Sequence, residues 1–596
     1  MAANGRSVIT MCMLIVLVSL GSAAAWGQRG FPESSDRNDI VPGQFFIDPP
    51  TLENLGFRWY VDGDKNRNAT VAVSYRVEGD EEWLSAQPML RVRHEIVDGG
   101  YRTGNLFAGS VLFLEPGTEY EVMFTMKDPD GGAPEAPRIE TVATRSEVKA
   151  WTDGRTLHVR PSESILEAYE KAAPGDIIML EAGLHEAKDA PYVLKKSGEP
   201  GKPIVFRGAG ADKTIIEGPN HATDLFCLSG VHDIVFEDLT LRRGSAAIHT
   251  SPAHLNNMKS HFVLDPGFAG PGASNITVRR CKIENVMNGI WTCSKNSRNW
   301  TIADNVLTGA NKRWYPFSAH EEAISFIGVN LYGQGHVVCY NRINRFLLLL
   351  CTADAGDPDP NDLERFPVNI DFYNNELFYG IGDTIQTDYT AHNIRVYRNL
   401  CSNARCGLSV QPSFGGPIYL IRNEVYGITE HYNKWNNKPA GIISVHNTIG
   451  ASFYTTPHQN CHLRNNLFFG GTNSTTLTPE LHTMDYDGFG GKIFTWAHGD
   501  VRKISHTSLE KFTAATGYEK HGIRISRDDF VNAVEYRAGT TWTPDDFDLR
   551  LKEGSKAIDS AVRLPNINDD YNGEAPDRGA IEFGDPRPHY GPREKK

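Results

Sequence analysis

Ile394-Arg395-Val396-Tyr397-Arg398-Asn399 and Ile418-Tyr419-Leu420-Ile421-Arg422-Asn423 decide the fold of this chain. In both stretches an apolar residue stands at the first and third positions, and an asparagine follows three residues later. The two asparagines are 24 residues apart. Apolar residues that alternate between turn signals indicate short β-strands, whereas a helical repeat would show a period of about 3.6 residues. The repeating unit is therefore made of strands and bends.

The asparagine position recurs through the middle of the chain. Its occupants, at steps of 24, 36, 34, 24, 24, 24 and 19 residues, are Cys281, Asn305, Asn341, Asn375, Asn399, Asn423, Asn447 and Asn466. A side-chain amide at a bend can pair with backbone groups whose burial without a partner would cost about 1–3 kcal/mol each. Amides stacked from coil to coil therefore predict a parallel β-helix, with a ladder that we expect to stop at Asn466.

The segment before this ladder has strands separated by glycine and proline turns, at 174–183, 198–206 and 214–218. This succession resembles the opening coils of secreted right-handed parallel β-helix proteins of the pectate lyase-like superfamily, including chondroitinase B-like and alginate lyases. The resemblance implies an all-β fold and a polysaccharide substrate. It extends to the fold and the opening coils only. The sequence has neither the catalytic Lys and Arg motif of those lyases nor the paired-aspartate and Gly-His-Gly segments of polygalacturonases. The helical pattern at 164–173 is the expected cap of the first coil.

An N-terminal β-sandwich is expected at 46–147, where short apolar strands alternate with turns. Leu114-Glu115-Pro116-Gly117-Thr118-Glu119-Tyr120 resembles a fibronectin type III signature. The resemblance implies a tyrosine corner, in which the Tyr120 hydroxyl bonds upstream backbone. We interpret this domain as a spacer or lid, with carbohydrate binding as the alternative.

The two ends of the chain carry further signals. Arg6, the apolar run 8–20 and Ala23-Ala24-Ala25 predict a signal peptide at 1–25, and hence secretion to the periplasm or the extracellular space. The β-helix is expected at 155–475 and a C-terminal closing segment, packed on it, at 476–596. A net charge of −13 disfavours nucleic acid and anionic membranes as partners. We expect a monomer with no membrane contact once the signal is removed.

Eight cysteines lie beyond the signal, all in the long middle region. Their spacing suits neither a disulfide scaffold nor a CxxC zinc site. We expect buried free thiols, with a Cys401–Cys406 disulfide as the alternative in an oxidising compartment.

Three insertions in the repeat predict where the chemistry lies. They fall near 252–272, 312–320 and 353–367, and repeat proteins place functional loops at such points. We expect the three to raise walls around one face, that of the strand before each loop, and to enclose an acidic groove. Such a groove between loops is the usual binding site.

Ionisable residues concentrate around these insertions. The candidate catalytic residues are Glu321, Glu322, Asp383, Asp388, His392, Lys312 and Arg313. The candidate substrate-binding residues, which offer aromatic surface, hydrogen bonds or positive charge, are Trp314, His320, Gln386, Tyr389, Gln411 and Arg345. A possible Ca²⁺ site, made of oxygen ligands in one loop, consists of Asp354, Asp357, Asp359 and Asp362. No organic cofactor is expected.

The alternation of the strand at 383–389 links several of these residues. If Ile385 and Thr387 point into the core, Gln386 and Asp388 face the groove, and Gln411 stacks beside them one coil later. Plain structural explanations compete with this interpretation. Aspartate-rich loops are commonly solvated turns, and Asp383 follows a glycine turn in which its carboxylate can bond backbone.

Two reactions and one binding role fit these residues. A lyase acting on uronic-acid sugars needs Ca²⁺ or cations to neutralise the sugar carboxylate, and a base, for which Lys312, Arg313, Arg345 and His392 are candidates. A glycoside hydrolase needs two carboxylates, at about 5–5.5 Å or about 6.5–9.5 Å according to its stereochemistry. Asp383 and Asp388, with Glu321 or Glu322, are candidates for that pair. We favour a lyase over a hydrolase, and both over a non-catalytic glycan-binding or surface protein.

Overall fold

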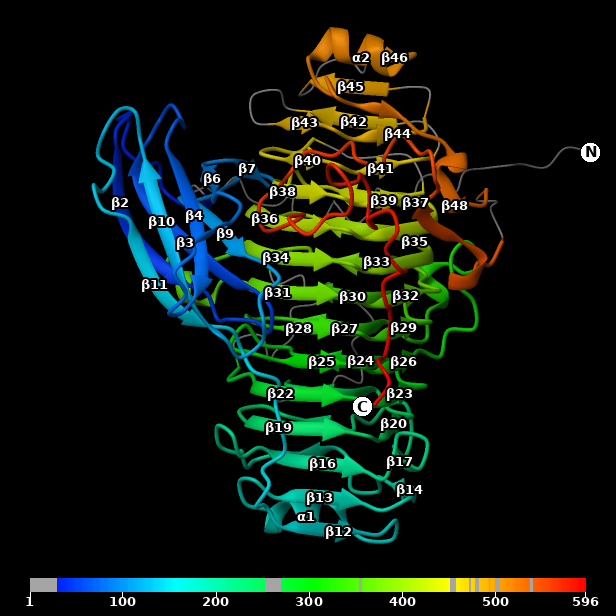
Figure 1. Ribbon diagram of the computed structural model, residues 1–596. Coiled ribbons are helices and arrows are strands. Elements are labelled where there is room, and N and C mark those ends of the chain that lie inside the picture. Colours follow the sequence, from blue (N-terminus) through cyan, green and yellow to red (C-terminus); the bar gives the residue numbers. More distant parts are fainter. Residues whose placement is uncertain are drawn as a thin grey trace, which may run out of the picture.

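The computed structural model describes residues 29–251, 270–352, 356–450, 457–470, 473–477, 482–491, 494–498, 504–535 and 540–595. The predicted signal peptide lies outside these residues. The chain forms a right-handed parallel β-helix, with a β-sandwich docked on one side of it (Figure 1). None of the described helices has the length and apolar character needed to cross a membrane.

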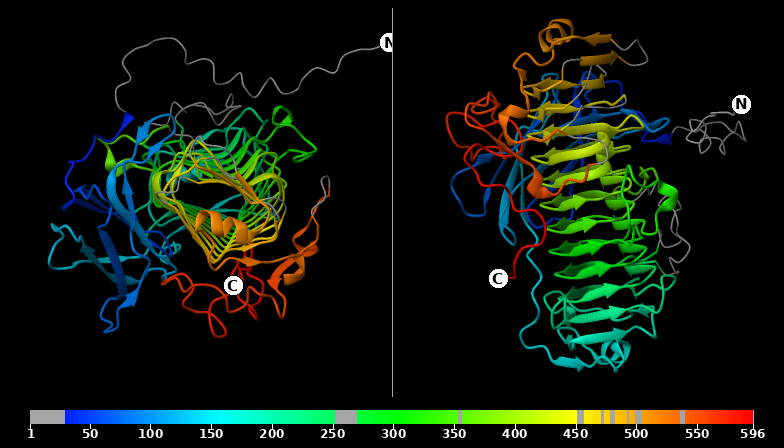
Figure 2. Two further views of the ribbon diagram at one scale, coloured as in Figure 1. Left: turned by 90° about the horizontal axis from the view of Figure 1, so that it is seen from above. Right: turned by 90° about the vertical axis from the view of Figure 1, so that its right-hand side faces the viewer.

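The β-helix is built from three rows of parallel strands, which Figure 2 shows along and across its axis. The first row is a 13-stranded sheet, formed in spatial order by β12 (Thr156–Val159), β13 (Ile177–Leu180), β16 (Ile204–Gly208), β19 (His232–Glu237), β22 (Ser274–Arg279), β25 (Thr301–Ala303), β28 (Val337–Cys339), β31 (Val368–Tyr373), β34 (His392–Tyr397), β36 (Phe414–Ile421), β38 (Ala440–Val445), β40 (His462–Arg464) and β43 (Thr483–Asp485).

The second and third rows together form one 20-stranded sheet. The second row contains β14 (Gly183–Glu186), β17 (Thr214–Glu217), β20 (Thr240–Arg242), β23 (Lys282–Glu284), β26 (Val306–Thr308), β29 (Arg342–Asn344), β32 (Glu376–Phe378), the first halves of β35 (Leu400–Val410) and β37 (Glu424–Trp435), then β39 (Thr448–Ile449), β41 (Leu467–Phe468), β44 (Gly488–Phe489) and β47 (Ile523–Arg524). The third row contains β15 (Tyr192–Val193), β18 (Phe226–Cys227), β21 (Ala246–His249), β24 (Asn288–Trp291), β27 (Ile327–Leu331), β30 (Leu348–Thr352), β33 (Asp383–Gln386) and the second halves of β35 and β37.

The asparagine ladder is present at the bend between the first and second rows. Each amide oxygen accepts from the backbone N–H of the preceding ladder residue, as in Asn375 to Asn399 at 3.1 Å and Asn399 to Asn423 at 3.1 Å. The prediction that the ladder stops at Asn466 is wrong. Asp487 continues it, because its Oδ1 accepts from Asn466 N at 2.7 Å and from Asn466 Nδ2 at 2.8 Å. A carboxylate oxygen accepts the same bonds as an amide oxygen, so the coils continue beyond the predicted boundary at 475.

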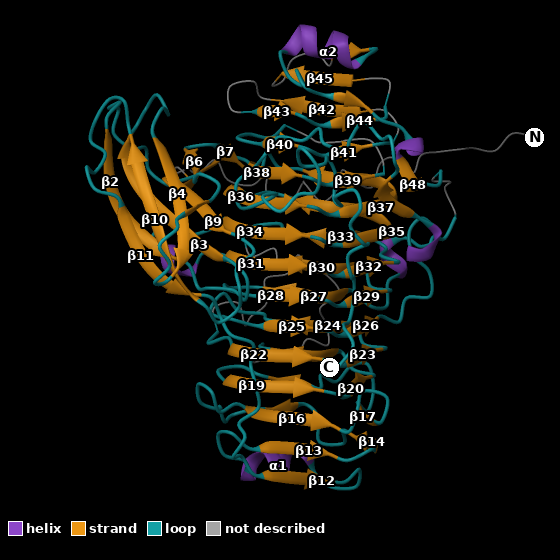
Figure 3. Ribbon diagram, viewed as in Figure 1, coloured by secondary structure: helices purple, strands orange, loops and turns teal. Residues whose placement is uncertain are grey.

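Both ends of the solenoid are covered. The predicted cap is α1 (Ile165–Lys171), whose N-cap Ser164 accepts from Glu167 N and whose Ile165 and Tyr169 are buried. At the other end stands α2 (Leu509–Thr516), whose Leu509 and Phe512 belong to the main core (Figure 3). Next to it are β42 (Asn473–Leu477), β45 (Phe494–His498) and β46 (Ile504–His506), which form a small sheet.

The N-terminal domain consists of two four-stranded antiparallel sheets packed around one core. One sheet has the order β2 (Ile40–Ile47), β3 (Leu55–Gly63), β9 (Asn105–Val111), β6 (Leu90–Arg93), and the other β11 (Arg138–Ala143), β10 (Glu119–Lys127), β4 (Thr70–Val77), β5 (Leu84–Ser85). The Tyr120 hydroxyl accepts from Glu115 N at 2.9 Å, as expected for a tyrosine corner. The fibronectin type III assignment itself stays a prediction. Three short strands, β1 (Arg29–Gly30), β7 (Ile96–Val97) and β8 (Tyr101–Arg102), join beside this domain.

Buried polar contacts fix this domain to the first row. Arg395 of β34 pairs with Asp371 of β31 at 2.5 Å and also donates to Ser110 of the sandwich at 3.0 Å. Asn393 donates to Asp48 of the sandwich at 2.9 Å. Hydrogen bonds from Arg395 and Asn393, both buried in the first row, thus fix the orientation of the domain.

From about residue 530 the chain lies along the solenoid rather than extending it (Figure 1, orange to red). It includes β48 (Phe530–Asn532) and β49 (Asp548–Leu551), which pair with each other. Near its end, Arg593 pairs with Asp304 at 2.7 Å and Lys595 with Asp238 at 3.0 Å. The eight cysteines beyond the predicted signal are free and buried, as the spacing predicts.

Candidate functional site

Two of the three predicted insertions flank the third row from both of its sides, and most of the third, near 252–272, lies outside the described residues. The loop before β27, at 309–326, joins the second row to the third, whereas the loop after β30, described from residue 356, joins the third row to the first. The prediction that each loop follows the same strand is therefore wrong for the first of these. The two loops still stand on either side of one row.

From β21 to β33, the third-row strands have two neighbouring residues that face the core, with one outward-facing residue on either side of them. In β33, Thr384 and Ile385 are the buried middle pair, and Ile385 belongs to the main core. The first outward position holds, from coil to coil, Ala246, Asn288, Ile327, Leu348, Asp383, Cys406 and His431. The second holds Cys227, His249, Trp291, Asn330, Cys351, Gln386, Ser409 and Lys434.

An ion pair joins the two outward positions across the late coils. Lys434 Nζ lies 2.9 Å from Asp383 Oδ2, and the two side chains are 23% and 6% exposed. Burial alone would lower the pKa of Lys434, but the carboxylates of Asp383 and Asp388 raise it overall. Lys434 is therefore a fixed positive charge that still reaches the surface.

Asp388 is held directly beside this pair. Its Oδ2 accepts from Gln386 Nε2 at 2.6 Å and its Oδ1 from Ser409 Oγ at 3.0 Å. Burial, followed by repulsion from Asp383, raises the pKa of Asp388 to about 7, against the attraction of Lys434. Near neutral pH this carboxyl group holds a proton for part of the time.

A second charged cluster lies next to it, formed by β35, β37 and the 309–326 loop. Arg405 Nε donates to Glu430 Oε2 at 2.6 Å, and the Tyr315 hydroxyl donates to the other oxygen of Glu430. Arg405 Nη1 lies 3.4 Å from His320 Nε2. Because a guanidinium has donors only, this nitrogen of His320 carries the lone pair and the proton sits on Nδ1. Partial desolvation and the charge of Arg405 lower the pKa of His320, so the ring is neutral at neutral pH.

Two further third-row side chains complete the surface. Desolvation lowers the pKa of His431, which is half-buried, and Arg405 and Lys434 act in the same direction. Burial, followed by the charge of Asp383, raises the pKa of the Cys406 thiol, so it stays protonated and is a poor nucleophile. The site therefore combines two fixed cations, two neutral imidazoles and a protonatable carboxyl group.

Some predicted residues meet here and others lie nearby. Asp383, Gln386, Asp388 and His320 belong to the cluster. Residues that lie in or against the 309–326 loop are Lys312, Arg313, Trp314, Glu321, Glu322 and Arg345.

These loop residues differ in what they contact. Lys312, Arg313, Glu321 and Glu322 are exposed, and Glu322 accepts from Ser318 at 2.8 Å. The Trp314 ring stacks on Tyr379 at 4.3 Å, and Arg345 supports the loop by donating to the Lys312 carbonyl at 3.4 Å.

His392 lies apart from this cluster. It is the first residue of β34, in the first row, and it is 1% exposed. Its Nδ1 lies 2.6 Å from the Gly416 carbonyl oxygen and its ring stacks on Phe366. Burial and the nearby Arg58 lower its pKa to about 4. His392 therefore packs in the first row beneath the N-terminal domain. From this place it cannot act as a base at the third row.

The aspartate-rich loop is paired with cations of the chain itself. Asp357 pairs with Arg29 at 2.5 Å, and Asp362 with Lys295 at 3.4 Å and with Arg365 at 3.2 Å. Asp359 accepts from Asn361 N at 2.9 Å, and Asp354 lies outside the described residues. The described aspartates of this loop do not converge on one point. Among the described residues, three side chains that could hold one metal ion come together only away from this loop.

Tyr389 and Gln411 mark the end of the third row. Tyr389 N donates to the Pro412 carbonyl at 3.0 Å, and Gln411 Oε1 accepts from Asn436 Nδ2 at 3.4 Å. Gln411 was expected beside Gln386, but Ser409 occupies that place. From Gln386 to Ser409 is 23 residues, and from Ser409 to Lys434 is 25 residues. The 24-residue spacing of the asparagine ladder therefore does not predict which residues pair in the third row.

Sequence reasoning missed Lys434, Arg405, His431, Glu430 and Tyr315. The signal was present, because Gln386, Ser409 and Lys434 follow one another at one coil spacing, as do Asp383, Cys406 and His431. β37 has neither an insertion nor an aspartate cluster, so the predicted site ends at Gln411.

Comparisons with known proteins give the following similarities. No family model matches the sequence. An uncharacterized protein YwoF of Bacillus subtilis is 31% identical over 114 residues, which is 18% of this chain and 24% of that protein. The chain thus spans about a quarter of the length of this relative.

Solved structures with a similar fold are distant in sequence. Pectate lyase Pel9A is 15% identical with a TM-score of 0.39, over 73% of this chain and 98% of that one. The family 28 exopolygalacturonase of Yersinia enterocolitica is 12% identical with a TM-score of 0.33, over 82% and 99%. The PL6 family alginate lyase AlyGC is 13% identical with a TM-score of 0.35, over 61% and 57%. The chemistry of the site rests on its own residues.

Proposed function

We propose that this protein is a secreted polysaccharide lyase that cleaves an acidic glycan by β-elimination at the third row of the β-helix. The observation that carries the proposal is the placement of Lys434 and Arg405, with the neutral His320 beside Arg405, on a chain whose net charge is −13. Both cations reach the surface from their ion pairs, so they can donate charge-assisted hydrogen bonds to an anionic sugar.

The two cations would bind the carboxylate of a uronic-acid sugar. Each is already held by one carboxylate, Lys434 by Asp383 and Arg405 by Glu430, which fixes its position before substrate arrives. Positive charge next to that sugar carboxylate stabilises the anion that forms when the neighbouring carbon loses its proton. Prearranged charges of this kind need no reorganisation during the reaction.

His320 is the candidate base. The ring is neutral near pH 7 for the reasons given above, and its Nε2 carries a lone pair that Arg405 Nη1 faces at 3.4 Å. That lone pair becomes free to take a proton when Arg405 turns to the sugar carboxylate. The base takes the proton from the carbon beside the carboxylate, the electron pair forms a carbon–carbon double bond, and the bond to the glycosidic oxygen breaks. The leaving oxygen takes up a proton from solvent, so the products are one saturated and one unsaturated chain end.

A glycoside hydrolase is the second candidate, and one observation favours it. Asp388 has a pKa raised to about 7 and lies near the charged Asp383–Lys434 pair, a division of roles typical of an acid and a base. However, Asp388 is 3% exposed and both its oxygens accept hydrogen bonds from side chains. An acid must reach the glycosidic oxygen, so the lyase is the better fit.

The test is an assay on a panel of uronic-acid glycans, followed by the absorbance of unsaturated products. The wild type and the surface variant Lys520→Ala should give the same rise, while Arg405→Gln should give little. New reducing ends without that absorbance would support the hydrolase. Binding to the panel without any product would identify a glycan-binding protein and contradict both reactions.

A further inference from the structure

An interior column of the first row changes its chemistry near the C-terminal end of the solenoid. Ile394, Ile418 and Ile442 pair in register on consecutive coils and are fully buried in the main core. The register of β38, β40 and β43 places Cys461 and then His482 at the next two positions. Cys461 and His482, whose side chains can bind a metal, thus follow three isoleucines in one column. The earlier coils show that an aliphatic side chain is enough to fill this position.

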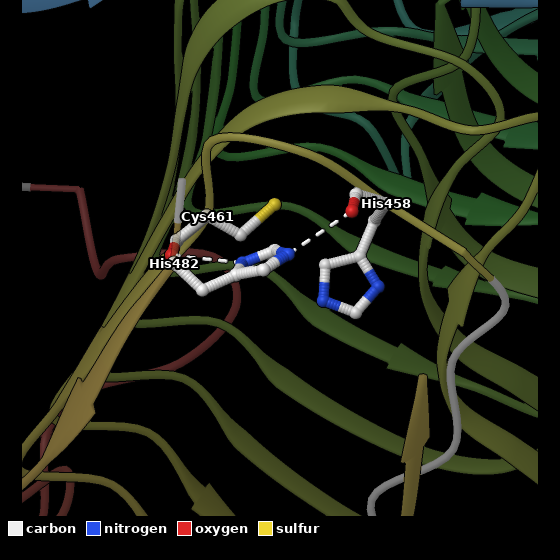
Figure 4. A group of neighbouring side chains, drawn as sticks. All are labelled: His458, Cys461 and His482. Carbon is white, nitrogen blue, oxygen red and sulfur yellow. Dashed lines mark hydrogen bonds between the residues drawn. The ribbon is translucent and has the colours of Figure 1, made fainter. Parts of the chain in front are cut away.

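A third such side chain converges on the same point. His458 comes from the turn before β40, and its ring centroid lies 4.7 Å from that of His482. One ligand atom each of His458, Cys461 and His482 lies within 4.8 Å of the others. The three side chains point toward one another inside the coil (Figure 4). They are 0%, 0% and 7% exposed, so water does not offset the cost of burying them.

The hydrogen bonds of His482 are not those of a satisfied neutral imidazole. Its Nδ1 lies 3.3 Å from the Cys461 carbonyl oxygen and its Nε2 lies 3.0 Å from the His458 carbonyl oxygen. A neutral ring has one N–H, so one nitrogen directs its lone pair at an acceptor. A bound cation would accept that lone pair and remove its repulsion from the carbonyl oxygen.

His336 provides a contrast from the same column. It is also fully buried, but its Nδ1 accepts from Trp300 N at 3.2 Å and its Nε2 lies 2.6 Å from the Tyr332 carbonyl oxygen. One acceptor and one donor satisfy a neutral imidazole completely. Burial in this column is therefore compatible with an ordinary histidine, and His482 differs from one.

We propose that His458, Cys461 and His482 form a binding site for a Zn²⁺ ion, which ties the turns before β40 and β43 together. Thiolate and imidazole are the ligands that zinc prefers, with Zn–S of about 2.3 Å and Zn–N of about 2.0–2.1 Å. Ligand atoms on one tetrahedral zinc are about 3.3–3.6 Å apart. The three ligand atoms lie within 4.8 Å of one another, so side-chain rotations that bring them closer by up to about 1.5 Å close them on the ion. A solvent molecule or a fourth group completes the tetrahedron.

The experiment measures metal in the purified full chain. After incubation with ZnCl₂ and removal of unbound ion, elemental analysis should find one zinc per chain. Titration with Co²⁺ should give a thiolate-to-cobalt charge-transfer band, which reports the Cys461 sulfur directly. A wild-type protein that takes up no zinc, or that shows no such band with Co²⁺, would overturn the proposal.

Matched variants locate the ion. Cys461→Val extends the aliphatic column and should fold, lose the zinc and lose the cobalt band. Cys401→Ala, at another fully buried thiol, should retain both. His482→Leu is the second removal variant if Cys461→Val does not fold. Zinc that persists undiminished in both removal variants would place the ion elsewhere and contradict the site.

Discussion

The early and late coils of the third row share one backbone plan but carry opposite outward surfaces. In the early coils five outward residues, Ala246, Trp291, Ile327, Leu348 and Cys351, pack into a buried apolar cluster. The polar outward residues of these coils, His249, Asn288 and Asn330, are buried as well. From β33 onward the same positions hold Asp383, Lys434 and His431 together with Gln386 and Ser409. The strands of both halves pair in one parallel sheet, with a β-bulge between Ala404 and Cys406 in the late half, and the outward residues differ.

This difference separates the requirements of folding from those of function. The inward residues of both halves are alike, since Val329, Leu350, Ile385 and Leu408 all belong to the same core. An apolar outward surface needs a cover, and the early coils are covered. Charged outward residues need partners or a ligand, and the late coils have ion pairs whose cations still reach the surface. The late half is therefore where an anionic chain can bind.

The largest effect is expected from His320→Gln. Glutamine keeps the polar contact to Arg405 but cannot take a proton, and loss of a general base lowers kcat by about 10²–10⁴-fold. The fold should not change, because His320 is exposed. Initial rates of unsaturated-product formation measure the effect, with Lys520→Ala as the control. Retention of wild-type kcat would remove His320 from the mechanism.

The next effect concerns the cation of the late half. The double variant Asp383→Asn with Lys434→Met removes both partners of the ion pair, and the neighbouring Asp388 can stay neutral by holding its proton. We expect a loss of about 10²–10³-fold in kcat/KM for an acidic glycan, because one electrostatic stabiliser is gone. Thermal unfolding should show a melting temperature close to that of the wild type. Unchanged kcat/KM in a folded double variant would show that the substrate does not use Lys434.

The early half should respond in the opposite way. Leu348→Ala removes a side chain that is 4% exposed in the apolar cluster, and such truncations cost about 2–5 kcal/mol of stability. The kcat measured at low temperature should stay near the wild-type value. Denaturant unfolding gives the free-energy change. A variant with full stability but reduced turnover would reverse the assignment of the two halves.

The smallest effect is a pH dependence at Asp388. Its pKa is raised to about 7 in the folded protein from an ordinary 3.8. The folded state therefore binds more protons than the unfolded state between these values, and this group's contribution to stability is present at about pH 4 and lost as the pH rises to about 7. Asp388→Asn removes the titration and should flatten that part of the stability profile. Melting temperatures from pH 4 to 8 provide the check, and an unaltered slope would contradict the shift.

The fold could be predicted because its signals are local and repeated. The asparagines at bends, alternating strands and the cap at Ile165 all follow from short-range patterns, and the structure has each of them. The end of the ladder could not be predicted, since Asp487 replaces an amide by a carboxylate that accepts the same two bonds.

The site was predicted only in part. Its residues pair across the third row, and the spacing of the third row differs from that of the asparagine ladder. The alternation at 383–389 correctly placed Ile385 inward and Gln386 beside Asp388. His392 was misplaced by one sheet, because its sequence closeness to Asp388 hides a corner between them. The pairing of Asp357 with Arg29 joins residues 328 positions apart, which no local pattern reports.

The most direct test of the account is the fate of solvent oxygen during cleavage of an acidic glycan. Digestion in heavy-oxygen water, followed by mass spectrometry of the fragments, distinguishes elimination from hydrolysis. The account predicts fragments with an unsaturated end and no heavy oxygen at the new reducing end. Incorporation of heavy oxygen there, without any unsaturated product, would contradict it.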